Sequence, residues 1–172
     1  DAISKTISIN TKDYYYQVAV KSGTPPLSFS YSRLSVGNSH CIVFSKDSFD
    51  NKEEISDILN SLYDSSVNIS FILNTEDFIK EPSSSIILRV NERGAGWTKS
   101  CGSGATATGA FISRFMLLPE NGSKKISELN ISQEGGELKI QNIFMTDLDG
   151  NYSPELYLSG PSTFEYDGVW ND

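Results

Sequence analysis

The stretch that decides the fold runs from Glu92 to Phe111 and reads ERGAGWTKSCGSGATATGAF. It joins a charged pair and a glycine-rich turn to a lone cysteine, Cys101, and then to a run of small residues. This run predicts a helix over about residues 104–118 that ends before Pro119. Because the first half of the helix is Ala, Thr and Gly, neighbouring elements can approach its backbone closely.

Cys101 stands at the start of this helix if the helix begins near Gly102. The positive end of the helix dipole favours a thiolate there and lowers the thiol pKa from its usual value of about 8.5. The backbone N–H groups of Gly102, Ser103 and Gly104 point the same way and suit a carboxylate or phosphate. The stretch therefore predicts a reactive sulfur and an anion pocket at one helix terminus.

Other interpretations of the same residues stay open. Cys101 has the size of a buried filler, and Glu92 with Arg93 forms either an exposed ion pair or a device that binds a zwitterion. A phosphate-binding loop is excluded because no lysine follows the glycines in the required position. A cysteine hydrolase needs a base, and His40 is the only histidine with which Cys101 can form a dyad.

The rest of the chain predicts an α+β domain with a mostly antiparallel sheet and two helices. A capping box followed by apolar residues at helical spacing places the second, peripheral helix at about residues 52–64. Strand and hairpin patterns cover residues 33–45, 67–74, 84–92, 125–132, 137–144, 156–159 and 163–170.

Composition narrows the class of protein further. The chain has 172 residues, of which 38% are hydrophobic, and a formal net charge of −8. The length suits one domain, and the acidic balance disfavours nucleic acid as a partner. No run of about eighteen apolar residues provides a membrane span. Two cysteines and one histidine indicate neither a disulfide framework nor a zinc site, so a reducing cytoplasm is the expected setting.

The stretch quoted above resembles the C-terminal signature of diaminopimelate epimerase. Three further segments follow that family's order: VGNSHCIVF at 36–44, VNISFI at 67–72 and LSGPSTFEYDGVW at 158–170. The resemblance implies two similar α/β halves, each a curved sheet around a central helix, with the active site between them. It implies a cofactor-independent epimerase of lysine and peptidoglycan precursor synthesis. In the mechanism that the resemblance implies, one cysteine removes the α-proton of LL-diaminopimelate, and another supplies a proton to the opposite face to give the meso form.

The resemblance also assigns roles to individual residues. Cys101 corresponds to one of the two acid/base cysteines. Glu92 is implied as a catalytic group and substrate contact near the cysteines, and His40 as a histidine that tunes the thiols. The other implied roles are substrate binding by Asn38, Asn68, Arg93 and the amides of Gly102 and Ser103, and a dimer contact by Tyr166. The resemblance implies no metal.

Three residues depart from the family pattern. Ser39 replaces a proline, Ser70 replaces a glycine, and Trp97 stands where many members carry a glutamate. The larger departure is that no first half with a partner cysteine precedes residue 34. Cys41 does not supply that partner, because its apolar strand pattern indicates a buried filler.

We therefore expect residues 34–172 to form the C-terminal epimerase domain, and residues 1–33 to be a linker or crossover from the missing first half. The expected partners are diaminopimelate, that N-terminal half and a second copy in a homodimer, and the chain alone is expected to be inactive. Two alternatives remain: half of a proline or hydroxyproline racemase, and a module that binds an amino acid or a partner without chemistry.

Overall fold

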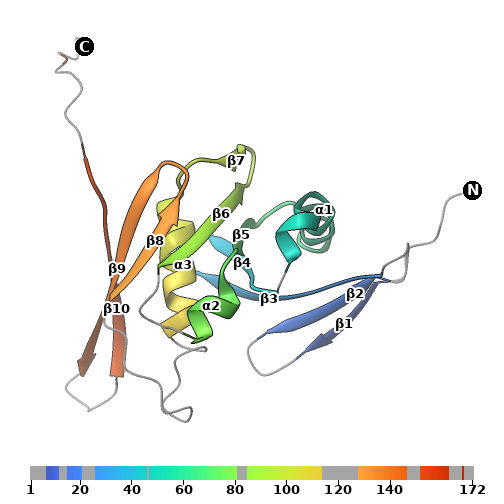
Figure 1. Ribbon diagram of the computed structural model, residues 1–172, viewed down its shortest axis with the longest axis horizontal. Helices are drawn as coiled ribbons and strands as arrows, with labels where there is room; N and C mark the ends of the chain where they lie inside the picture. The colour runs from blue at the N-terminus through green and yellow to red at the C-terminus, as the bar shows by residue number, and fades with distance from the viewer. Residues whose placement is uncertain are drawn as a thin grey trace, which may run out of the picture.

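The computed structural model describes residues 7–11, 15–20, 26–45, 47–80, 85–113, 128–146, 152–162 and 168. In this part of the chain ten strands form one open sheet that carries helices on both faces (Figure 1). The strands are β1 (Ile7–Thr11), β2 (Tyr16–Val20), β3 (Leu27–Ser35), β4 (Ser39–Val43), β5 (Asn68–Ile72), β6 (Ile86–Glu92), β7 (Gly96–Thr98), β8 (Glu128–Gln133), β9 (Gly136–Thr146) and β10 (Tyr152–Ser159).

Sheet order follows chain order, from β1 to β6 and then through β8, β9 and β10, while β7 pairs with β6. Every neighbouring pair is antiparallel except β4 with β5 and β6 with β8. Parallel neighbours need a crossover connection, and helices α1 (Lys52–Leu62) and α3 (Gly102–Phe111) lie in these two connections. Because the two parallel pairs run in opposite directions, right-handed crossovers place α1 and α3 on opposite faces.

The core is divided between these two faces by strand alternation. In β4, Ile42 packs in the cluster around α3, whereas Cys41 and Val43 pack in the cluster around α1. In β5, Phe71 faces α1 and Ile72 faces α3 in the same way. The face of the sheet to which a side chain of the central strands points therefore decides whether it packs against α1 or α3.

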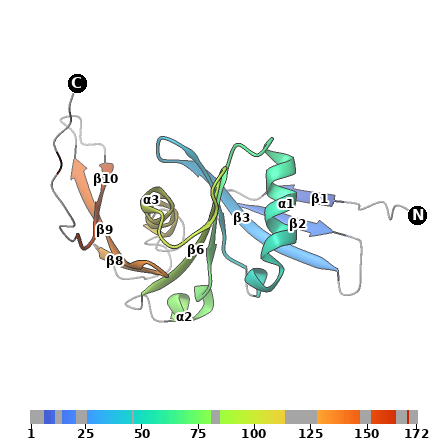
Figure 2. The same cartoon turned by 90° about the horizontal axis from the view of Figure 1, so that it is seen from above.

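Helix α3 lies inside the curve of the sheet, between β8–β10 and the central strands (Figure 2). It contacts β3, β4, β5, β9 and β10. Its small residues permit this close packing, because a Cβ at Gly109 would stand 2.7 Å from Ile140 Cγ2 on β9. The predicted fold class, a mostly antiparallel α+β domain around a central helix, is confirmed.

Several predicted elements agree with the structure. Helix α1 matches the prediction at 52–64 to within two residues, and β8 and β9 form the predicted hairpin. Helix α3 begins at Gly102 and ends at Phe111, and residues 112–113 are π-helical, whereas residues 114–118 of the predicted helix lie outside the described residues. Most of the strand predicted at 163–170 also lies outside them.

Other elements differ from the prediction. Residues 33–45 form parts of two antiparallel strands, β3 and β4, because Gly37 has a φ of 102° and turns the chain. A third α-helix, α2 (Thr75–Lys80), follows β5 and was not predicted, since six residues are too short to show a helical period. A 3-10 helix, η1 (Ser48–Asn51), precedes α1.

Residues before 34 contribute strands to the sheet. β2 and β3 pair with each other, β3 pairs with β4, and Val18 and Phe29 are buried in the cluster around α1. The domain boundary after residue 33 stays a prediction.

Candidate active site

Cys101 forms the N-cap of α3. Its backbone is extended, with φ −139° and ψ 107°, and its Sγ accepts a hydrogen bond from the N–H of Gly104 at 3.3 Å. Its carbonyl oxygen accepts the N–H of Ala105 at 3.0 Å. Gly102 and Ser103 are therefore the first two helical residues, whose N–H groups have no acceptor within the helix. The predicted position of the cysteine at the helix start is confirmed.

The ionisation of Cys101 differs from the prediction. Its side chain is buried, and burial raises the pKa of the thiol because the thiolate loses its hydration. Hydrogen bonds from Ser103 and Gly104 lower the pKa, and the hydrogen bond and negative charge of Glu92 raise it again. The groups at the helix start act in the predicted direction, but burial is stronger. The resting site therefore holds a thiol.

Glu92 reaches the thiol from the end of β6. Its carboxylate accepts a hydrogen bond from the Thr98 hydroxyl on β7, which fixes one of its oxygens. Gly94 in the turn between these strands and Gly96 at the start of β7 have φ of 79° and 74°, where residues with side chains are strained. The glycines of the quoted stretch thus fold the chain back so that Glu92 and Cys101 meet.

A chain of polar contacts joins β4 to the start of α3. His40 Nε2 lies 3.1 Å from Asn38 Oδ1, and Asn38 Nδ2 donates to Ser103 Oγ at 3.4 Å. Ser103 Oγ in turn lies 3.5 Å from Cys101 Sγ. Four of the predicted site residues therefore lie within one connected group.

His40 is fully buried beneath this group. Burial lowers its pKa, and the negative charge of Glu92 opposes that effect. Its Nδ1 has no hydrogen-bond partner among the described residues. In the resting site the imidazole is neutral and linked through Asn38 to the start of α3.

Asn68 supports the site through the backbone. Its Oδ1 accepts the N–H of Arg93 at 2.9 Å, so β5 holds the turn that follows Glu92. The side chain of Arg93 is exposed. The substrate contacts predicted for Asn68 and Arg93 stay predictions, and Tyr166 lies outside the described residues.

Trp97 of β7 lies next to the turn between β6 and β7. Its ring packs against Phe49 and Phe71, with ring centroids 5.7 Å apart in both cases. Its Nε1 donates to the Glu53 carboxylate on α1 at 3.1 Å. The tryptophan therefore ties the turn to α1 and does not approach the Cys101 group.

Cys41 lies on the opposite side of the sheet from this group. It is fully buried in the cluster around α1, and burial raises its pKa to about 12. Its interpretation as a buried filler is confirmed.

Sequence analysis missed Gln133, whose side chain holds the backbone of Cys101. Cys101 N donates to Gln133 Oε1 at 2.7 Å, and Gln133 Nε2 donates to Cys101 O at 3.2 Å. No local pattern marks a glutamine at the end of a hairpin strand as the partner of a cysteine 32 residues earlier.

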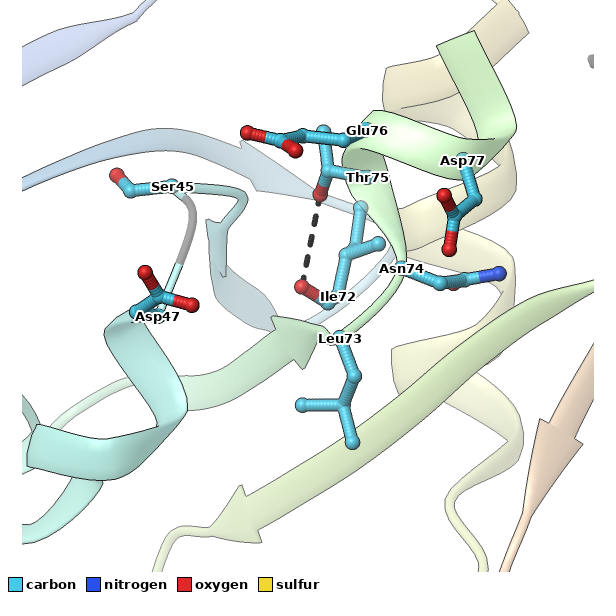
Figure 3. Close-up of a pocket in the computed structure, with 8 residues that line it drawn as sticks. All are labelled: Ser45, Asp47, Ile72, Leu73, Asn74, Thr75, Glu76 and Asp77. Carbon is cyan, nitrogen blue, oxygen red and sulfur yellow. Dashed lines mark hydrogen bonds between the residues drawn. The ribbon is translucent and has the colours of Figure 1, made fainter. Parts of the chain in front are cut away.

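A pocket of about 150 Å³ lies at the C-terminal ends of β4 and β5, near the start of α2 (Figure 3). Its lining includes Asp47, Glu76 and Asp77, and Thr75 Oγ1 bonds Ile72 O at 3.5 Å. None of the predicted site residues lines it.

Among the described residues, no three His, Cys, Asp or Glu side chains group as metal ligands. None of the helices that the structure describes has both the length and the apolar composition of a membrane span.

The sequence of the chain is similar to those of several known proteins. A scan against protein-family models finds no match. The protein of Xanthomonas euvesicatoria named diaminopimelate epimerase is 31% identical over 144 residues, 82% of this chain and 44% of the relative. The enzymes of that name from Buchnera aphidicola and Vesicomyosocius okutanii are 31% and 30% identical, over 82% and 90% of this chain and 43% and 47% of their own lengths.

The chain is therefore similar to part of a class of proteins whose name describes isomerases. These relatives are named diaminopimelate epimerase, in agreement with the resemblance found in the sequence. The chain spans about half the length of the curated relatives that it matches.

Proposed function

We propose that this chain carries one half of the active site of a cofactor-independent epimerase that inverts an α-carbon of diaminopimelate. The observation that carries the proposal is the group around the Cys101 thiol. At the start of α3 the sulfur lies beside Ser103 and Glu92, and His40 is linked to it through Asn38. The homology to diaminopimelate epimerases supports this substrate.

In the proposed mechanism, the N–H groups of Gly102 and Ser103 bind the α-carboxylate of the substrate at the positive end of the helix dipole. This places the α-carbon beside Cys101 Sγ. The thiol is protonated at rest, so it is ready to donate a proton to the α-carbon. In the reverse direction Cys101 acts as a thiolate, breaks the α C–H bond and takes up that proton.

Inversion needs a second acid/base group on the opposite face of the α-carbon, since a single base returns its proton to the side from which it came. Cys41 does not provide this group, because it lies in the core on the far side of the sheet. We propose that the second cysteine belongs to a first half outside residues 1–172. The relatives, of which this chain spans about half, are long enough to hold both halves. A homodimer through Tyr166 and a cytoplasmic setting are further parts of the proposal.

The proposal is tested first by substrate binding. LL-diaminopimelate is titrated into the 15N-labelled chain, and 1,5-diaminopentane, which has the amines but no carboxylate, serves as the control. We expect weak binding that shifts the amide signals of Gly102 and Ser103, and no such shift with the control. Equal shifts with both compounds would contradict the carboxylate site.

The chemistry is tested by conversion of LL- to meso-diaminopimelate, followed by 1H NMR, because a single base can exchange the α-proton without inversion. The chain alone should form no more meso isomer than Cys101→Ser. Supplied with the first half of the Xanthomonas relative, the chain should invert the α-carbon, and Cys101→Ser in the same mixture should not. Inversion by the chain alone would contradict the half-site, and inversion that survives Cys101→Ser would contradict the role of Cys101. Binding without inversion in the completed pair would identify a binding module.

A further inference from the structure

The turn between β8 and β9 touches the residues that lead into α3. Gln133, the last residue of β8, is buried and pairs with both backbone groups of Cys101, at 2.7 Å from its N and 3.2 Å from its O. The two bonds close a ring between one carboxamide and one residue. Such a pair fixes the orientation of Cys101 more firmly than either bond alone, because each restricts rotation about the other.

The same turn holds the residues just before Cys101. Gly135 N donates to Lys99 O at 2.7 Å. A Cβ at Gly135 would stand 3.1 Å from both Lys99 O and Ser100 Cβ, so the turn and this segment are in close contact. The turn therefore holds Lys99 and Cys101 through their backbone and lies against Ser100 between them.

The turn is also tied to the strand that carries Glu92. Glu134, next to Gln133, forms an ion pair with Arg89 of β6, with Nε and Oε1 3.0 Å apart. Arg89 lies three residues before Glu92 on that strand. The turn thus connects Cys101 with the strand that carries Glu92. Its contacts are with the backbone of Cys101 and the side chain of Arg89, and not with the thiol or the Glu92 carboxylate.

We propose that Gln133 is a positioning residue that directs the Cys101 thiol towards the start of α3. Its carboxamide hydrogen-bonds to the backbone N and O of Cys101, whereas the sulfur contacts Ser103 and Gly104. The sulfur in turn accepts the Gly104 N–H at 3.3 Å, a bond that depends on the orientation of the cysteine. The catalytic meaning of this role rests on the proposed epimerase function, whereas the geometric role does not.

The test uses the whole chain and needs no turnover. Gln133→Met keeps an unbranched side chain of similar volume and removes both hydrogen bonds. Gln141→Met, at an exposed glutamine of β9 whose side chain bonds only the exposed Glu128 among the described residues, is the matched control. Hydrogen exchange of the Gly104 amide is measured by NMR, with the Thr108 amide one turn later as the reference for overall stability.

In Gln133→Met the Gly104 amide should exchange roughly tenfold faster, relative to Thr108, which is the factor expected for the loss of about one hydrogen bond. The change in the Gly104 amide shift when Cys101 is ionised by raising the pH should shrink as well, because the sulfur no longer faces that amide. Gln141→Met should change neither quantity. An unchanged Gly104 amide in Gln133→Met would overturn the proposal.

Gln133→Asn keeps the inference testable if Gln133→Met does not fold. Its amide is one methylene shorter and cannot reach both backbone groups of Cys101 at their present distances. We expect an exchange rate at Gly104 between those of the native chain and Gln133→Met, and a native rate would overturn the proposal. If these results hold while the completed pair shows no epimerase activity, the function fails and the positioning role stands.

Discussion

The packing of α3 against β9 predicts that Gly109→Ala destabilises the fold, although alanine is the better helix former. The added methyl would lie 2.7 Å from Ile140 Cγ2, 3.2 Å from Ile140 Cβ and 3.3 Å from Ile140 Cγ1. Real Cβ contacts do not approach to less than 3.0 Å. Both residues are buried, and a β-branched side chain has little freedom at χ1 in its strand, so the helix or the strand must shift.

The magnitude follows from two opposing effects. Replacing Gly by Ala inside a helix contributes about 1 kcal/mol in favour of folding. Overpacking of a close-packed core costs about 1–3 kcal/mol. Because the clash involves a stiff side chain, we expect the upper part of that range and a net loss of about 1–2 kcal/mol. At a urea m-value of about 2 kcal/mol/M, the midpoint of unfolding falls by about 0.5–1 M.

Urea unfolding, followed by circular dichroism, measures this change. Ala110→Gly, at the neighbouring half-buried position, shows the effect of helix propensity alone and should cost about 1 kcal/mol. In an Ile140→Ala background, which removes Cγ1 and Cγ2, Gly109→Ala should become neutral or stabilising. A higher midpoint for Gly109→Ala in the native background would refute the close approach of α3 and β9.

Two further predictions concern buried polar groups near the site. Because burial lowers the pKa of His40 from 6.5, the unfolded chain binds more protons than the folded chain as the pH falls through 6.5. The free energy of unfolding should therefore decrease from pH 7.5 to pH 5.5, by at most about 1.4 kcal/mol per pH unit, and His40→Gln should flatten this slope because the chain has no other histidine. Ser70→Ala should raise the free energy of unfolding by about 1 kcal/mol, since the buried Ser70 hydroxyl has no hydrogen-bond partner among the described residues. Ser48→Ala, which removes a bond of 2.8 Å to Ser45 O, should lower it by a similar amount, and equal effects of the two serine variants would contradict the assignment of Ser70 as unpaired.

The features that could be predicted from the sequence are those that depend on neighbouring residues. The start of α3 follows from a cysteine ahead of small residues and glycines, and the span of α1 follows from helical spacing of its apolar residues. The β8–β9 hairpin follows from the paired glycines at 135 and 136. Each of these is decided by interactions within a few positions along the chain.

The features that could not be predicted depend on residues that meet only in the folded chain. The pKa of Cys101 rises mainly because the folded chain buries the thiol, and burial is not visible in the sequence around it. Gln133 is separated from Cys101 by 32 residues, and its role depends on the parallel pairing of β6 with β8, which brings the hairpin beside the start of α3. Local reasoning therefore located the thiol at the helix start but not the residues that bury it and hold its backbone.

The two cysteines show why a residue count is a poor guide to a two-base reaction. Cys41 follows His40 directly, yet strand alternation sends the two side chains to opposite faces of β4. His40 thus joins the group around Cys101, while Cys41 joins the core around α1 and would have to cross the sheet to reach the same substrate. The alternation that builds the site on one face excludes the chain's other thiol from it. If the proposed two-cysteine mechanism holds, its second cysteine must therefore lie outside the described residues.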